Sequence, residues 1–519
     1  MQSLNLINGN ILTQDEQNPK ASSVYIEDGK IKQLNFTQNN AKTINLDGAT
    51  VIPGFIDAHF HLKNYGKRLE ELNLKGLSSL NEIKKILIDK INTTKKGDWI
   101  FGFGWDQNLW NNKAFPPSTF LNKIAPNNPI YFTRIDGHAC WVNEATIIKI
   151  NLTIKQLNDI DGGKVINNCV VIDNAMGPFK KHLPKENKQQ VKRWIKLAAD
   201  NASKMGITGV HDAWQDRITV ESIIELINEN KFPIRCYGML ASNDQGLLNE
   251  YFNQGHYQNE YLTIRSVKAF IDGALGSRGA ALHEPYSDDH NNCGLILISK
   301  EEFSKLATQC YKHNFQLNTH AIGDKGNDFV LNHYAKTLGS SNNRRWRIEH
   351  AQMVADQDIY QFKKYNILPS MQPSHCTSDM KWLPGRIGNH RLKLISRWQS
   401  FINAGLKIPG GSDCPIETGN PLFEFYAAIT RQDHQGWPKK GFQPQEKVDR
   451  KHALKMFTSW AAYGGFEDNK RGQIKIGFDA DLTILDNNLL SVESHNILKT
   501  KILYTIVNGK IIIEKERSK

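Results

Sequence analysis

The sequence has few cysteines and no long apolar run, and both absences narrow the class of protein. Only seven of the 519 residues are cysteine, they are widely spaced, and none forms a Cys-x-x-Cys pair. Neither a disulfide framework nor a cysteine metal site is therefore expected. No stretch of eighteen apolar residues occurs, and the first residues lack the basic start and apolar core of a signal peptide. We expect a cytoplasmic protein with no membrane contact.

Basic residues exceed acidic residues, but they do not gather into a binding module. The chain has 65 Lys and Arg against 53 Asp and Glu, which gives a net charge of +12. No basic stretch is interleaved with aromatic residues as in nucleic-acid-binding modules, so no nucleic-acid partner is expected. We interpret the charge as a solvated surface that can steer an anionic small molecule.

Hairpin patterns mark both ends of the chain. The pairs Asn8-Gly9, Asp28-Gly29 and Asn508-Gly509 each lie between short apolar stretches, and such pairs supply the positive φ angles of tight turns. Neither end holds enough strands for a stable sheet of its own. We therefore predict that residues 1–54 and 465–519 combine into one small composite β-sandwich domain.

The centre of the chain, residues 55–464, alternates strand and helix patterns. Eight strand–helix units in succession are typical of a (β/α)₈ barrel, so the predicted fold class is α/β, a distorted (β/α)₈ TIM barrel. The predicted strands are Val51–Leu62, Gly209–Ala213, Ile234–Leu240, Ser266–Gly273, Phe315–Gly323, Arg345–Ala351, Ile367–Pro373 and Lys407–Pro415, and the clearest helices are Val220–Asn228, Lys300–His313, Asp356–Tyr365 and Ile395–Ala404.

One connection in this barrel is too long for a loop. Well over a hundred residues separate the first and second predicted strands, and loops of that length without structure of their own are rare. We predict a folded insertion over about residues 62–204. Because it leaves the barrel at the C-terminal end of a strand, we expect it to cover the barrel mouth.

Residues that can bind a metal fall at the ends of five predicted strands. His59 and His61 are two apart on the first strand, so both side chains can point to one side. Each residue alone has a plainer interpretation: a hydrogen-bonded histidine, a lysine paired with an acid, or an aspartate in a turn. Five strand ends in one order are hard to obtain by chance, and barrel enzymes place their chemistry there. The candidate metal ligands are His59, His61, Lys268, His320, His350 and Asp413.

This order of ligands resembles the amidohydrolase superfamily, and more closely its branch of N-substituted formamide deformylase-like metal-dependent hydrolases. The resemblance extends through most of the chain. Its further motifs are Gly102-Phe103-Gly104-Trp105-Asp106, Asp136-Gly137-His138, Phe270-Ile271-Asp272-Gly273-Ala274-Leu275-Gly276-Ser277-Arg278 and Gly477-Phe478-Asp479-Ala480-Asp481-Leu482.

The resemblance implies a centre of two divalent metal ions. His59, His61 and Asp413 would hold the more buried ion, and His320 and His350 the second. Lys268 would bridge the two after reaction with CO₂ to form a carbamate. Mixed imidazole and carboxylate ligands favour zinc, with manganese or iron as alternatives. Asp413 would be the catalytic residue that moves protons.

The resemblance also implies a small-molecule substrate and, by analogy with relatives, a possible homodimer. Four of the predicted substrate-binding residues lie in the insertion, and Trp105 among them has the alternative of a core residue. Two cysteines near the ligands, Cys376 and Cys414, are interpreted as buried thiols. The predicted substrate-binding residues are Trp105, Asp106, Arg134, His138, Arg278, Gln372 and His375.

Three functions fit these residues. The first is a metal-dependent hydrolase that cleaves a non-peptide C–N bond, an N-acyl or N-formyl amide. The second is a deaminase of the cytosine or guanine type with one metal ion, which needs no bridging lysine and uses an acid soon after the strand-five histidine; Asp324 is the nearest here. The third is a metal-free relative that only binds, but none of the candidate ligands is missing.

Overall fold

The computed structural model describes residues 3–135 and 137–515. The chain divides into two compact units, one made of Met1–Tyr65 with Ile195–Lys519 and the other of Gly66–Trp194. Among the described residues, no helix has the length and apolar character needed to cross a membrane. Two helices each contain a boundary between the units: α1 (Leu62–Glu70) and α7 (Lys188–Lys204).

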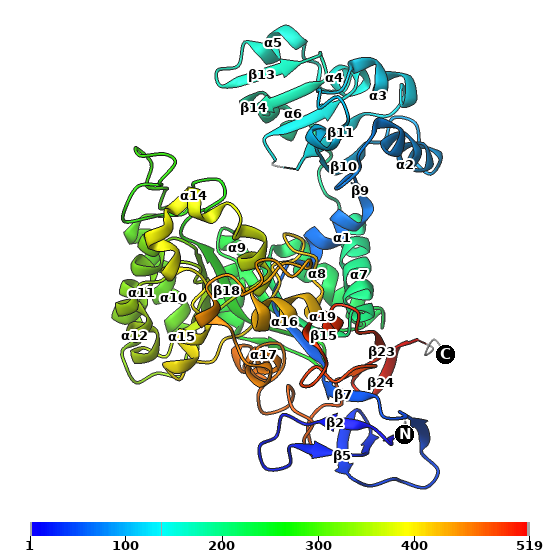
Figure 1. The fold of residues 1–519 in the computed structure, drawn as a ribbon, viewed down its shortest axis with the longest axis vertical. Coiled ribbons are helices and arrows are strands. Elements are labelled where there is room, and N and C mark those ends of the chain that lie inside the picture. Colours follow the sequence, from blue (N-terminus) through cyan, green and yellow to red (C-terminus); the bar gives the residue numbers. More distant parts are fainter. Residues whose placement is uncertain (1–2, 136, 516–519) are drawn as a thin grey trace. The chain divides into compact units, whose positions relative to one another are not determined.

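A parallel sheet of seven strands forms the centre of the larger unit (Figure 1). Its strands are almost continuously buried, as expected of parallel strands covered on both faces. The order β21-β20-β19-β18-β16-β15-β8 follows the chain, and a short antiparallel strand, β17, pairs with β18. The strands are β8 (Phe55–Phe60), β15 (Ile207–Gln215), β16 (Arg235–Ala241), β17 (Tyr257–Gln258), β18 (Leu262–Phe270), β19 (Gln316–Ala321), β20 (Arg347–His350) and β21 (Leu368–Ser370).

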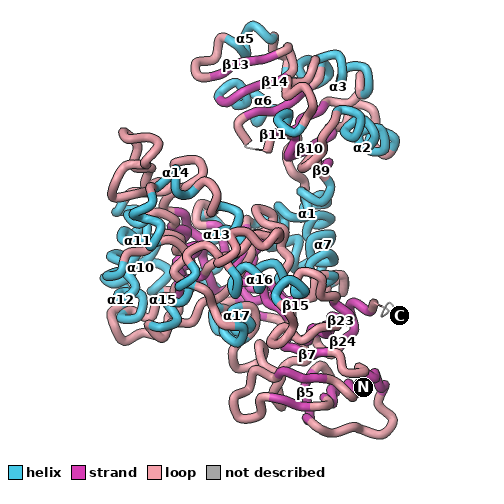
Figure 2. Tube along the Cα trace, viewed as in Figure 1, coloured by secondary structure: helices cyan, strands magenta, loops and turns pink. Residues whose placement is uncertain are grey.

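Helices follow these strands and lie outside the sheet, as Figure 2 shows for α10, α11, α12 and α15. The α10 helix illustrates the local cause, because Ser299 and Glu302 form a capping box and the apolar face from Phe303 to Cys310 is buried. The predicted helices are present, although the last is shorter. The helices are α8 (Arg217–Asn228), α9 (Gln245–Gln254), α10 (Lys300–Lys312), α11 (Asp324–Leu338), α12 (Asp356–Lys364), α13 (Pro373–Asp379), α14 (Leu383–Ile387), α15 (Trp398–Asn403), α16 (Pro421–Thr430), α17 (Arg450–Met456), α18 (Ser459–Gly464) and α19 (Ser494–Ile497), with 3₁₀ turns at Asn389–Leu394 and Pro444–Glu446.

The eighth predicted strand, Lys407–Pro415, is not a regular strand. One isolated bridge joins it to β8, between Phe60 and Cys414, and another joins Gly410 to Met371, the residue directly after β21. A regular ladder fails here because two prolines lack an N–H and Asp413 has a φ of +59°. The segment nevertheless hydrogen-bonds to β8 and to Met371, directly after β21, and so to both edges of the seven-stranded sheet. An eighth barrel strand would make the same connection.

Strands from both ends of the chain share one sheet. The N-terminal strand β7 pairs antiparallel with β22, so Val51 lies opposite Ile484. The six-stranded sheet has the order β24-β23-β22-β7-β2-β3, and a second sheet of N-terminal strands has the order β5-β4-β1-β6. The strands are β1 (Ser3–Ile7), β2 (Asn10–Leu12), β3 (Lys20–Ala21), β4 (Val24–Glu27), β5 (Lys30–Leu34), β6 (Lys42–Asn45), β7 (Thr50–Pro53), β22 (Leu482–Leu485), β23 (Ile502–Val507) and β24 (Lys510–Glu514).

Two of the three predicted hairpins are present, and the first is wrong. The turns at Asp28-Gly29 and Asn508-Gly509 join β4 to β5 and β23 to β24 with positive φ at both residues. At Asn8-Gly9 the chain instead passes from one sheet to the other, because β1 pairs with β4 and β6 while β2 pairs with β3 and β7. Apolar residues of both sheets, such as Leu6 and Ile484, pack into one core.

The smaller unit has a sheet of its own with an apolar core on each face. Along β11, Ile130 and Phe132 belong to one core and Tyr131 to the other, as the two-residue period of a strand requires. The sheet order is β13-β14-β12-β11-β10-β9. The elements are β9 (Leu72–Asn73), β10 (Ile100–Trp105), β11 (Ile130–Arg134), β12 (Ala139–Val142), β13 (Gly163–Ile166), β14 (Val170–Asp173), α2 (Leu80–Asn92), α3 (Ser118–Ile124), α4 (Glu144–Ile150), α5 (Ile154–Asn158) and α6 (Gly177–His182), with 3₁₀ turns at Gln107–Leu109 and Asn174–Met176.

A buried ion pair links the barrel to the six-stranded sheet, and its loss should destabilise the larger unit. Arg235 of β16 donates to both oxygens of Asp481, from Nε at 2.9 Å and Nη2 at 3.0 Å. Arg235→Ala leaves Asp481 buried without this partner, so we expect the free energy of unfolding to fall by roughly 3–5 kcal/mol. Arg217→Ala, which removes an exposed pair with Glu250, should change it by at most about 1 kcal/mol. Equal effects in urea denaturation would contradict this interpretation.

Candidate metal centre

The predicted metal ligands meet at one end of the barrel. Asp413 Oδ1 lies 3.0 Å from His61 Nε2 and 3.5 Å from His59 Nε2. Lys268 of β18 reaches the same place, with its Nζ 3.2 Å from His59 Nε2. The spacing of His59 and His61 along β8 and the placement of Lys268 near the end of β18 therefore bring these four side chains together.

The last two predicted ligands lie beside this group. The ring centroid of His350 is 4.9 Å from that of His59 and 4.6 Å from that of His320. One potential ligand atom from each of His59, His350 and Asp413 lies within 4.8 Å of the others. The six residues thus form one cluster of nitrogen and oxygen donors, of a kind that divalent transition metals bind.

Carboxylate and amide groups orient these histidines from behind. His59 Nδ1 lies 2.6 Å from Glu349 Oε2, and His350 Nδ1 lies 2.7 Å from Gln372 Oε1. Partners of this kind fix the tautomer and ring orientation of metal-binding histidines. The sequence analysis missed Glu349, although the alternation Arg347, Glu349 in a buried strand was a signal that a charged pair points into the barrel.

Asp57 ties the irregular eighth segment to β8. Its carboxylate accepts hydrogen bonds from the backbone N–H of His59 and of Ser412, and from the Ser412 hydroxyl at 2.6 Å. A Cβ on Gly411 would lie 2.4 Å from the His59 nitrogen. The segment can therefore approach β8 only with glycine at this position, and this approach places Asp413 beside His59.

Two of the candidate ligands have unusual backbone conformations. His350 has a φ of +74° and Asp413 a φ of +59°. Residues other than glycine rarely adopt such angles, and those that do gather at functional sites. His350 is the last residue of β20, and Asp413 lies in the irregular eighth segment, so both angles occur where regular strand geometry stops.

Burial favours the neutral form of three histidines of the cluster, His59, His320 and His350. It lowers the pKa of His59 and His350 well below the usual range and that of His320 to about 3, where the Lys268 charge contributes in the same direction. Burial also lowers the pKa of Lys268. Neutral imidazole is the form that binds a metal.

Two buried histidine nitrogens support a metal at this place. Among the described residues, His320 Nε2 and His375 Nε2 at this place, and His211 Nε2 elsewhere in the barrel, are buried without a hydrogen-bond partner, which is costly for a polar atom unless something binds it. His375 Nε2 lies 3.6 Å from Asp413 Oδ2, and His320 Nε2 lies 3.5 Å from Asp272 Oδ1. The donor set therefore fits divalent metal ions in its chemistry and in its unsatisfied atoms.

Three predicted substrate-binding residues lie in the larger unit. Gln372 and His375 follow β21 and contact the cluster through His350 and Asp413. Arg278 is at the surface, where its guanidinium forms two hydrogen bonds to Asp288. The structure thus brings Gln372 and His375 to the candidate centre and gives Arg278 a partner within its own loop.

The structure corrects one of the four predictions in the smaller unit. Trp105 is fully buried in an apolar core beside Trp141, and its indole N–H donates to the Phe132 carbonyl. Its large apolar side chain packs the sheet, so no surface of it remains for a substrate.

The other three residues keep accessible surface. Arg134 lies 3.5 Å from Asp106, and the exposed His138 lies 2.9 Å from Asp173. Their contact with substrate stays a prediction, and Asp136 of the same motif lies outside the described residues.

A sequence profile of the amidohydrolase family matches residues 42–513, which is most of the chain. The chain belongs to the amidohydrolase family. The predicted resemblance is thereby confirmed, and the protein is an enzyme of this family of hydrolases, which act on carbon–nitrogen bonds.

Similar proteins extend over nearly the whole chain. The Protein LONG AFTER FAR-RED 3 of Arabidopsis thaliana is 31% identical, with 97% of this chain and 90% of the relative covered. The N-substituted formamide deformylase of Arthrobacter pascens is 24% identical, with 100% and 99% covered. The crystal structure of an uncharacterized metal-dependent hydrolase from Pyrococcus horikoshii superposes with a TM-score of 0.80 at 27% identity, covering 95% of this chain and 99% of that one.

His350→Ala should release metal from this amidohydrolase. His350 supplies one of three potential ligand atoms that lie within 4.8 Å of one another, so its loss should weaken metal binding at least as much as the roughly 10–100-fold that loss of an outer partner costs. Elemental analysis after dialysis against a weak chelator measures the retained metal. His452→Ala, which removes a histidine paired with Asp449, serves as the control. Equal metal content in the two variants would show that His350 is not a ligand.

Proposed function

We propose that this amidohydrolase cleaves an N-acyl or N-formyl amide at a centre of two divalent metal ions, with zinc as the expected metal. The observation that carries the proposal is the convergence of His59, His61, Lys268, His350 and Asp413 on one buried place. The similarity to an N-substituted formamide deformylase supports the substrate class.

Some residues of the chain would bind the metal ions, and one of them would also transfer the proton. His59, His61 and Asp413 would hold the more buried ion, and His320 and His350 the second. Ions bound there would supply Lewis acidity to the amide carbonyl and to a water molecule. Burial of the surrounding residues keeps these interactions strong, because the local dielectric constant is low.

Asp413 is suited to move the proton. Its Oδ1 lies near His59 and His61, while its Oδ2 faces His375 at 3.6 Å. One oxygen can therefore stay with the ligands while the other accepts a proton from the attacking water and delivers it to the leaving amine. The amine must leave as the protonated, neutral species, because expulsion of an amide anion is too costly at neutral pH.

Lys268 is proposed to carry a carbamate. Its buried amine lies 3.2 Å from His59 Nε2, and burial lowers its pKa and so favours the neutral form. The neutral amine attacks CO₂: an N–C bond forms, one C–O π bond opens, and one proton leaves the nitrogen to solvent. The neutral amine thereby becomes an anionic carbamate with two oxygen donors. The alternative is an ordinary lysine paired with an acid beside a single ion. A mononuclear deaminase needs no bridging lysine, so Lys268 argues against that function.

The smaller unit is proposed to cover the barrel mouth and to contact the substrate through Asp106, Arg134 and His138. Gln372 and His375 would contact the substrate from the larger unit. A small-molecule substrate, a cytoplasmic location and a homodimer complete the proposal.

A substrate screen tests this function directly. Protein purified with zinc and bicarbonate would be assayed against N-formyl amines, N-acetyl amines, N-acyl amino acids, esters and aminopurines. We expect turnover of an N-formyl or N-acyl amide that a chelator abolishes and zinc restores. Release of ammonia from an aminopurine, with no amide turnover, would favour the deaminase instead.

Asp413→Asn should preserve the shape of the site and remove its base. We expect turnover of the best amide to fall by roughly 10²–10⁴-fold, the usual contribution of a general acid–base group. Stopped assays across neutral pH measure the loss. Asp379→Asn, which removes a carboxylate bonded to Gln352, is the control. Turnover of Asp413→Asn within a few-fold of wild type would assign the proton transfer to another group.

Lys268→Ala should lose both metal and activity. Short carboxylic acids added to the buffer should restore part of each, because they can supply the two oxygens that the carbamate provided. Metal analysis and turnover are measured with and without acetate or propionate. A Lys268→Ala variant that retains full metal content and activity without added acid would contradict the carbamate.

A further inference from the structure

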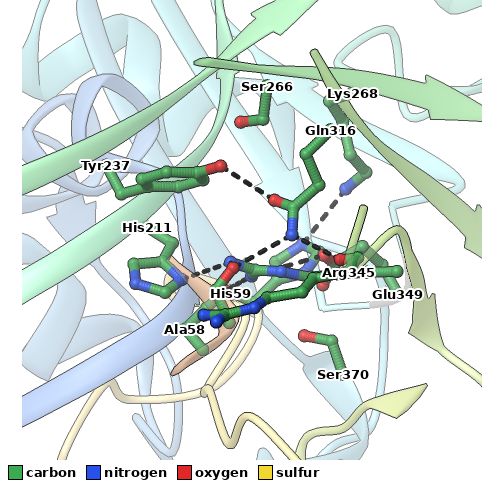
Figure 3. Close-up of polar contacts among 12 residues, drawn as sticks. Ala58, His59, His211, Tyr237, Ser266, Lys268, Gln316, Arg345, Glu349 and Ser370 are labelled. Carbon is green, nitrogen blue, oxygen red and sulfur yellow. Dashed lines mark hydrogen bonds and ion pairs between the residues drawn. The ribbon is translucent and has the colours of Figure 1, made fainter. Parts of the chain in front are cut away.

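The barrel interior beneath the metal centre is polar, which is unusual. The interior of such barrels is normally filled by branched apolar side chains. Here the inward-facing residues of adjacent strands include Ser266, Gln316 and Glu349, which Figure 3 labels, and Arg347, and all four are fully or almost fully buried. Removing a guanidinium and a carboxylate from water costs free energy, so we expect these two groups to have a function.

The guanidinium of Arg347 is held from three sides. Its Nη2 donates to the Gly464 carbonyl at 2.5 Å and lies 3.0 Å from His211 Nδ1, while Nη1 donates to the Ala58 carbonyl at 3.3 Å. Gly464 ends α18, and Ala58 directly precedes His59 in β8. Arg347 therefore connects the end of α18 to the backbone that carries the first candidate ligand.

The Gly464 carbonyl that binds this guanidinium has a second hydrogen-bond partner. The Gly464 carbonyl also accepts a hydrogen bond from Gln316 Nε2 at 3.0 Å. The side-chain oxygen of Gln316 accepts in turn from the Tyr237 hydroxyl at 2.9 Å (Figure 3). Strands β16, β19 and β20 thus fix the position of Arg347 together.

Arg347 also faces the carboxylate that orients His59. Its Nη1 lies 3.7 Å from Glu349 Oε1, and the other oxygen of Glu349 lies 2.6 Å from His59 Nδ1. A hydrogen bond at Nδ1 fixes which ring nitrogen carries the proton. His59 Nε2 is then free of a proton and faces Lys268 Nζ and Asp413.

We infer that Arg347 is a positioning residue of the metal centre, acting through Glu349 to fix the tautomer and direction of the His59 ring. The inference rests on the proposed metal-dependent function. Arg347 thus affects the candidate ligand His59 without contacting it directly.

The test measures zinc affinity in a double-mutant cycle with Arg347→Met, Glu349→Gln and the double variant, using a competing chromophoric chelator. We expect each single variant to weaken zinc binding by roughly 10–100-fold, as loss of an outer partner does. The zinc affinity of the double variant should be about equal to that of the single variant with the lower affinity, because both substitutions act on the same ring. Wild-type affinity in Arg347→Met, or losses that simply multiply in the double variant, would overturn the inference.

Arg235→Met is the matched control, because Arg235 is an equally buried arginine of the same barrel that pairs with Asp481. It should lower stability and leave zinc affinity unchanged. If Arg347→Met does not fold, Arg347→Gln takes its place, with the same expected loss of zinc affinity.

The tautomer gives a second readout that needs no metal. The NMR signal of His59 in apoprotein labelled with ¹⁵N-histidine is identified as the one that is missing from His59→Ala. In wild type this signal should report a proton on Nδ1. In Arg347→Met it should shift towards a mixture of tautomers. An unchanged His59 signal in Arg347→Met would overturn the inference, and wild-type protein that binds no zinc would instead overturn the proposed function.

Discussion

The main constraint on this molecule is the burial of ionisable groups at one end of its barrel. His59 and Lys268 have no exposed surface, and Asp413 and His350 have little. Charged forms of such groups are stable only when they are paired with one another or bound to a metal. The hydrogen bond between His59 and Glu349 shows how the protein meets this constraint, since it satisfies one buried group with another and leaves the other ring nitrogen of His59 facing Lys268 and Asp413.

The irregular parts of the barrel follow from the same constraint. A regular eighth strand would alternate its side chains without regard to the cluster, whereas the segment after Pro409 turns at Asp413 through a positive φ and is held by Asp57. Gly411 permits the close approach to β8. The departure from regular strand geometry is thus tied to the residue on which the proposed chemistry depends.

The sequence was most informative where side-chain period and chemistry agreed. This holds for the pair His59 and His61 and for the strand-end positions of Lys268, His320 and His350. The turns at Asp28 and Asn508 were predictable because each residue precedes a glycine between two apolar stretches. Local patterns could not reveal that the chain changes sheets after Asn8 or that the Lys407–Pro415 segment forms only isolated bridges, because partner strands far away in the sequence decide both. Trp105 illustrates the same limit, since packing within the smaller unit decides its role. The cover of the smaller unit over the barrel mouth, the division into domains and the roles of individual ligands stay predictions.

The central claim is a metal centre of two ions bridged at Lys268, and anomalous diffraction at the zinc edge tests it most directly. Crystals of wild-type protein grown with zinc and bicarbonate would be measured on both sides of the edge. The account predicts two anomalous peaks within the cluster of His59, His61, His320, His350 and Asp413, with electron density for a carbamate extending from Lys268 between them. A single peak beside an unmodified lysine, or no peak in this cluster, would contradict it.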